Sequence, residues 1–124
     1  MSQADKQARI AIVGPCASGK TTLAHALQSK KLSARQIAQE HSYVANMWEV
    51  LTKPTILIYL DATYPVCTQR KSLSWTSKEY EAQKERLAHA RANCHVYIDT
   101  DKLTPDEVLQ HSLQALEDLG IEIK

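Results

Sequence analysis

Residues 14–21 have the residue types and spacing that phosphate chemistry requires. They read Gly-Pro-Cys-Ala-Ser-Gly-Lys-Thr, which matches the pattern G-x-x-x-x-G-K-[ST] without a gap. In such a loop, backbone N–H groups surround a phosphate, the lysine reaches the β- and γ-phosphate oxygens, and the final hydroxyl binds Mg²⁺. We therefore expect this segment, called the glycine loop below, to bind the polyphosphate of a nucleoside triphosphate.

Each position of the glycine loop has an expected role. Gly14 and Gly19 allow backbone conformations and a close approach that a Cβ atom would obstruct. Lys20 is the expected catalytic cation, and Thr21 is the expected magnesium ligand because Mg²⁺ prefers oxygen ligands. The following helix adds partial positive charge at its N-terminus. The residues expected to bind ATP (or GTP) are Gly14, Pro15, Cys16, Ala17, Ser18, Gly19, Lys20, Thr21 and Thr22.

Two residues of this set allow a second interpretation. Cys16 lies near a helix start, where a thiol can become reactive, but a small apolar filler is the favoured interpretation. Thr22 is placed either to reach the α-phosphate or to face solvent or the core.

The segments around the glycine loop alternate between strand and helix patterns. The apolar run at 9–13 ends at Gly14, and the run at 55–60 has the same doubly buried character. Residues 96–98 indicate a last core strand that ends at Asp99. Residues 33–39 indicate a short second strand ending at Glu40, with a helix as the alternative. Helices are predicted over 20–29, 42–52, 65–70, 76–93 and 104–119. This order predicts an α/β fold in which a small parallel sheet has helices on both faces.

Two acidic residues follow predicted strands. In an open parallel sheet, ligands bind beyond the carboxyl ends of the strands. Asp61 is expected either to hold a magnesium-bound water or to cap the next helix. Glu40 is expected to act as a catalytic base or to bind the acceptor substrate, with Arg35 or His41 aiding it. If that segment is helical, these three are ordinary surface residues.

Basic residues after residue 69 could form a lid. An arginine that closes over a nucleotide stabilises the charge on the transferred phosphoryl group. Arg70 is the strongest candidate, with Arg86 and Arg91 behind it, and the alternative is a solvated charged helix. Trp75 either covers the site on closure or only anchors its loop.

Length, charge and cysteine content limit the remaining possibilities. The 124 residues suggest one domain over 1–124, with a flexible tail at 1–8 and a lid at 70–93. A net charge of +1 argues against non-specific nucleic-acid binding. Without an apolar membrane span or a secretory signal, and with three widely spaced cysteines, we expect a cytoplasmic protein with reduced thiols. No Cys-x-x-Cys or paired-histidine pattern indicates a zinc site.

The glycine loop resembles that of the P-loop NTPases, and three further segments are similar to their small nucleoside and nucleotide kinases. The first segment is Ile-Tyr-Leu-Asp (58–61) followed by Tyr-Pro-Val (64–66) and Arg70. The second is the basic stretch 70–91, and the third runs from Ile98 to Val108. The resemblance implies a three-layer P-loop fold in which the loop after the last strand flanks the nucleotide base. It implies an Mg²⁺-dependent kinase that transfers the γ-phosphate of a nucleoside triphosphate to a small acceptor.

The chain departs from that kinase pattern in ways that leave a second function open. It lacks an Asp-Gly-Phe-Pro-Arg segment and an Asp-Arg-Tyr/His segment, which help relatives to bind their acceptor, and it is shorter than such kinases. A third core strand between the glycine loop and residue 55 is missing or shortened. The alternative is a non-catalytic nucleotide-binding module or a slow NTPase switch that uses the nucleotide to order residues 70–93.

Overall fold

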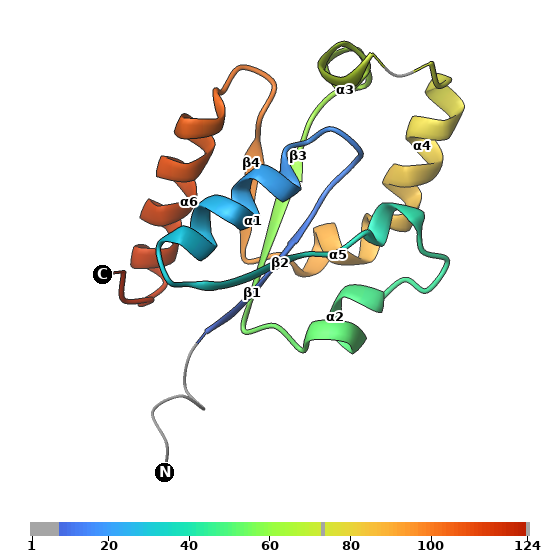
Figure 1. Ribbon diagram of the computed structural model, residues 1–124. Coiled ribbons are helices and arrows are strands. Elements are labelled where there is room, and N and C mark those ends of the chain that lie inside the picture. Colours follow the sequence, from blue (N-terminus) through green and yellow to red (C-terminus); the bar gives the residue numbers. More distant parts are fainter. Residues whose placement is uncertain (1–7, 73, 124) are drawn as a thin grey trace.

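The computed structural model describes residues 8–72 and 74–123 and contains a four-stranded parallel sheet with helices on both faces (Figure 1). The strands are β1 (Arg9–Val13), β2 (Ser33–Gln36), β3 (Ile56–Asp61) and β4 (Val96–Asp99), in the order β2-β1-β3-β4. All pairs are parallel, so the carboxyl ends of the four strands meet at one edge. The predicted α/β class and parallel sheet are confirmed.

The two faces of the sheet bury different side chains because successive residues of a strand point to opposite sides. Ile56, Ile58 and Leu60 of β3 pack beneath α1 (Lys20–Ser29) and α6 (Pro105–Asp118). Leu57 and Tyr59 face the other layer, which contains α2 (Met47–Thr52) and α5 (Ala88–Asn93) (Figure 1). The strands β1 and β3 are buried on both faces, which explains why their sequences are continuous apolar runs.

Two of the described helices begin at a threonine whose side chain caps them. The Thr104 side chain and Glu107 form a reciprocal capping box at the start of α6, and Pro105 occupies the first turn. Thr76 accepts a hydrogen bond from the Glu79 backbone at the start of α4 (Ser77–Arg86). The remaining helix, α3 (Tyr64–Lys71), lies beyond the carboxyl end of β3 (Figure 1).

The second strand is shorter than its sequence pattern predicts. It ends at Gln36 rather than at Glu40, and a 3₁₀ turn, η2 (Gln39–His41), follows. The Gln39 side chain accepts a hydrogen bond from the Trp48 backbone and donates one to the Val44 carbonyl. The Trp48 N–H is thus bonded to Gln39 and not to the Val44 carbonyl, its acceptor in a helix beginning at residue 42, and α2 begins at Met47.

The predicted tail and lid are described only in part. The tail at residues 1–8 lies, except for Ala8, outside the described residues. Within the predicted lid at 70–93, Leu87 and Ala90 are fully buried in the core under β3, so α5 belongs to the body of the domain. No helix of the described residues has both the length and the apolarity that crossing a bilayer requires.

Candidate functional site

The glycine loop leaves β1 through a position that only glycine fits. A Cβ atom on Gly14 would lie 2.1 Å from the Leu60 carbonyl oxygen and 2.7 Å from Ser18 Oγ. Gly19, which precedes α1, has φ +99° and is left-handed, as is Ala17 at φ +67°. The loop therefore turns sharply against the end of β3 before the helix begins.

The loop presents backbone donors that the described residues leave without acceptors. Over residues 16–22, hydrogen bonds to protein acceptors are made by the N–H groups of Cys16, to Gln83 Oε1, and Ser18, to the Pro15 carbonyl. The N–H groups of Ala17, Gly19, Lys20, Thr21 and Thr22 have no such partner in this part of the chain. Donors of this kind, at the positive end of a helix dipole, favour an anion.

Lys20 is buried at the centre of this site, and its ammonium has three acceptors. Nζ donates to the carbonyls of Gly14 at 2.9 Å and Pro15 at 3.1 Å, and to Glu40 Oε2 at 2.9 Å. The Lys20 and Glu40 side chains are only 8% and 5% exposed. The sequence predicts Glu40 at this edge of the sheet, and η2 brings it to the lysine although β2 ends early.

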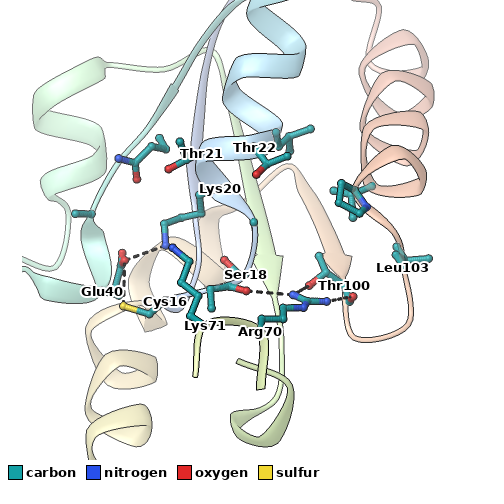
Figure 2. A pocket seen from close by; sticks show the side chains of 17 residues that line it. Cys16, Ser18, Lys20, Thr21, Thr22, Glu40, Arg70, Lys71, Thr100 and Leu103 are labelled. Carbon is teal, nitrogen blue, oxygen red and sulfur yellow. Dashed lines mark hydrogen bonds and ion pairs between the residues drawn. The ribbon is translucent and has the colours of Figure 1, made fainter. Parts of the chain in front are cut away.

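A cavity of about 570 Å³ opens beside the loop. Figure 2 shows Lys20 and Glu40 on one side of it and Arg70 with Thr100 on the other. The cavity is large enough for a small organic ligand, since such sites usually measure about 300–1,000 Å³. Its lining comprises Cys16, Ala17, Ser18, Gly19, Lys20, Thr21, Thr22, Leu23, Gln36, Ala38, Glu40, Arg70, Lys71, Thr100, Leu103, Pro105 and Val108.

Arg70 joins the glycine loop to the loop after β4. Its guanidinium donates to the Ala17 carbonyl at 3.2 Å, to Thr100 Oγ1 at 3.0 Å and to the Thr100 carbonyl. The arginine therefore lies at the wall of the cavity, and its present partners are protein oxygens (Figure 2).

No family model and no curated protein matches the chain.

Asp61 is not brought to the cavity. Asp61 is two residues after Tyr59 in the strand, so the two side chains point to the same face of β3. The buried Leu60 points to the opposite face. On the Tyr59 face, Asp61 Oδ1 accepts a hydrogen bond from Lys84 Nζ at 2.6 Å and Asp61 Oδ2 accepts one from the Tyr97 hydroxyl at 2.6 Å. The predicted magnesium pair of Thr21 and Asp61 is thus divided, with Thr21 at the cavity and Asp61 outside its lining.

The Asp61–Tyr97 contact predicts a change of stability at alkaline pH. Burial, together with the hydrogen bond to Asp61, raises the pKa of Tyr97 from 10.0 to about 12. The neutral phenol thus favours the folded state fully below pH 10, and this contribution is lost as the pH rises towards about 12. We expect the stability advantage of the wild type over Tyr97→Phe to stay constant up to pH 10 and then to shrink.

Urea unfolding of both proteins across this pH range measures the difference. Because other tyrosines titrate in both proteins, their contributions cancel when the two curves are subtracted. A stability difference that stays constant up to pH 12 would contradict the hydrogen bond between the Tyr97 hydroxyl and Asp61.

Other predicted site residues lie around the cavity rather than in it. Arg86 donates to the Glu40 carbonyl at 3.1 Å, so it supports the turn that holds Glu40. Arg91 stacks on the Tyr97 ring, with its guanidinium carbon 3.8 Å from the centroid, outside the cavity lining. Arg35 is exposed and does not line the cavity, and Trp75 packs against Tyr64 and Tyr80. Trp75 thus anchors its loop, which is one of its two expected roles.

Eight residues of the cavity wall were not predicted as site residues from the sequence. They are Leu23, Gln36, Ala38, Lys71, Thr100, Leu103, Pro105 and Val108. Thr100 follows the last strand, and its N–H and hydroxyl both donate to the Asp61 carbonyl, which fixes the loop that Arg70 contacts. Its position at the carboxyl end of a parallel strand is the signal that could have identified it.

Proposed function

We propose that this protein binds a magnesium nucleoside triphosphate at the glycine loop and transfers its γ-phosphoryl group to a small acceptor of the nucleoside or nucleotide type. The observation that carries the proposal is the group of free backbone donors around Lys20 at the wall of the cavity. Phosphoryl transfer requires positioning and charge neutralisation rather than covalent chemistry by the protein, and the site supplies both.

The residues divide this work among them. The backbone donors of the loop bind the β-phosphate, and Lys20 leaves Glu40 to neutralise phosphate charge. Arg70 is placed to stabilise charge on the transferred group from the opposite wall. Once Lys20 has moved, Glu40 is a buried carboxylate able to orient or deprotonate an acceptor hydroxyl.

Thr21 fits the magnesium role on the present geometry. It is the first-turn hydroxyl beside the lysine, it is exposed, and it lines the cavity, while Mg²⁺ requires few protein oxygens because it keeps waters and substrate phosphates. Bound there, Mg²⁺ would bridge phosphate oxygens and neutralise their charge.

A slow NTPase or nucleotide-dependent switch is the second candidate, and a specific observation favours it. Arg70 is engaged by Ala17 and Thr100, so the arginine that a fast kinase would use already has partners. In a switch, the nucleotide would change these contacts and reorder residues around Arg70.

Thermal unfolding with nucleotides, followed by product analysis, distinguishes these functions. At a ligand concentration 100-fold above its Kd, binding adds about 2.7 kcal/mol of stability. We expect ATP or GTP with Mg²⁺ to raise the melting temperature, and adenosine, which lacks the phosphates, to do so far less. Acceptor-dependent formation of a phosphorylated product supports the kinase, whereas slow hydrolysis that no acceptor accelerates supports the switch. Absence of any triphosphate-dependent shift would refute both.

Arg70→Ala should reduce turnover more than nucleotide binding. Loss of one preorganised donor to a charge that develops during reaction typically lowers kcat about 10²–10³-fold. The matched control is Arg91→Ala, since Arg91 stacks on Tyr97 away from the cavity. Steady-state kinetics and nucleotide titrations of both variants check this, and equal turnover in Arg70→Ala and Arg91→Ala would contradict the role of Arg70.

A further inference from the structure

A thiol, a carboxylate and an imidazole converge beside the glycine loop. Cys16 Sγ lies 3.4 Å from His41 Nε2 and 4.0 Å from Glu40 Oε2, and His41 Nε2 lies 3.8 Å from the same oxygen. Among the described residues, this is the one group of three or more potential metal ligands close enough together to share an ion. The proposed phosphoryl transfer uses Glu40 but neither Cys16 Sγ nor His41.

The distances suit a tetrahedral ion with soft and borderline ligands. Ligand atoms about 2.0–2.3 Å from a tetrahedral zinc ion stand about 3.3–3.6 Å from one another. The separations of 3.4, 3.8 and 4.0 Å reach that range with shifts of a few tenths of an ångström. Thiolate and imidazole favour zinc over magnesium, which takes oxygen ligands.

A second observation concerns the Glu40 carboxylate. Its Oε2 accepts the Lys20 hydrogen bond, whereas its Oε1 is buried and has no hydrogen-bond partner among the described residues. The side chain is only 5% exposed, and an unsatisfied buried polar atom is costly. The carboxylate therefore has a free oxygen, Oε1, beside the Oε2 atom that accepts from Lys20 and lies near Cys16 and His41.

Neighbouring groups are arranged as in a supported metal site. Gln83 is buried, accepts a hydrogen bond from the Cys16 backbone N–H at 3.0 Å and places its Nε2 3.3 Å from Cys16 Sγ. Such contacts orient a ligand and are typical of the second layer around a metal. His41 is 57% exposed, which gives the ion a route from solvent.

We propose that Cys16, Glu40 and His41 form a zinc site at the edge of the glycine loop, with the fourth position open to water. On binding, Zn²⁺ displaces the Cys16 thiol proton to solvent and takes one carboxylate oxygen and the neutral His41 nitrogen, so that no electron transfer is involved. The three ligands come from two segments of the chain that meet only in the folded protein. No sequence pattern typical of zinc sites therefore predicts them.

Titration of the reduced, nucleotide-free full chain with Co²⁺ and then Zn²⁺ tests the site without relying on activity. We expect Co²⁺ to give the charge-transfer absorption of a cobalt–thiolate bond, and Zn²⁺ to remove it by displacement. Cys16→Ser should abolish this absorption. The matched control, Cys94→Ser, removes the other half-buried free cysteine and should retain it.

His41→Gln keeps the proposal falsifiable if a change at Cys16 disturbs folding, because most of the His41 side chain is solvent-exposed. It should weaken zinc binding at least 10-fold, since even loss of a second-layer partner typically costs 10–100-fold. Zinc affinity equal to wild type in both Cys16→Ser and His41→Gln would overturn the site. So would absence of the thiolate absorption in the folded wild type. Neither result would bear on nucleotide binding, which is tested separately.

Discussion

Lys20→Met should abolish most of the stabilisation that a nucleoside triphosphate confers on the wild type. That stabilisation is about 2.7 kcal/mol at 100-fold excess over Kd, and the lysine supplies the one buried cation among the loop's donors. The variant should also unfold more easily, because it leaves the Glu40 carboxylate buried without its partner. Breaking a buried ion pair from one side typically costs about 3–5 kcal/mol.

A double variant separates these two effects. Lys20→Met/Glu40→Gln removes both charges, so we expect its stability without nucleotide to return close to that of the wild type. Its response to ATP or GTP should remain as small as in Lys20→Met. Calorimetric unfolding of the three proteins with and without nucleotide provides the measurement. Triphosphate affinity at the wild-type level in the double variant would refute the role of Lys20.

Gly14→Ala should destabilise the folded protein by about 3 kcal/mol or more. The added Cβ would lie 2.1 Å from a backbone oxygen of β3, the Leu60 carbonyl, which cannot move without disturbing the sheet. Overpacking typically costs about 1–3 kcal/mol, and the unfavourable backbone conformation at φ +156° adds to it. Denaturant unfolding without ligand measures this directly.

Gly120→Ala is the matched control because Gly120 also has a positive φ, +90°, but a Cβ added there would meet no atom within 4 Å. Its expected cost is about 1–2 kcal/mol, from backbone strain alone. The difference between the two variants therefore isolates the steric contact with β3. Equal losses of stability in the two variants would contradict the close contact between Gly14 and the Leu60 carbonyl.

The local signals in the sequence predicted the elements that position the site. The apolar run at 9–13, the two glycines and the stripe of α1 are contiguous, and their periodicities are properties of a single strand or helix. The strand signals at 55–60 and 96–98 and the capping box at Thr104 likewise depend on residues a few positions apart. These features could be predicted because the physics that determines them is short-range.

The face of the sheet to which a side chain points, and the residue at which a strand ends, could be established only from the tertiary structure. The position of Asp61 after a strand suggested a metal ligand, but which face of β3 its side chain takes depends on the packing of both helical layers. Similarly, the end of β2 was decided by hydrogen bonds from Gln39 to a segment that follows it, which no strand propensity contains.

The sequence by itself determined the glycine loop, its lysine and the alternation of strands and helices, because each is encoded in neighbouring residues. Only the folded chain decided that Glu40 holds Lys20, that Arg70 bridges two loops, and that Cys16 meets His41. These contacts join residues 20, 30 and 25 positions apart in the sequence. Their geometry follows from the packing of the whole sheet and its two layers, which no single segment specifies.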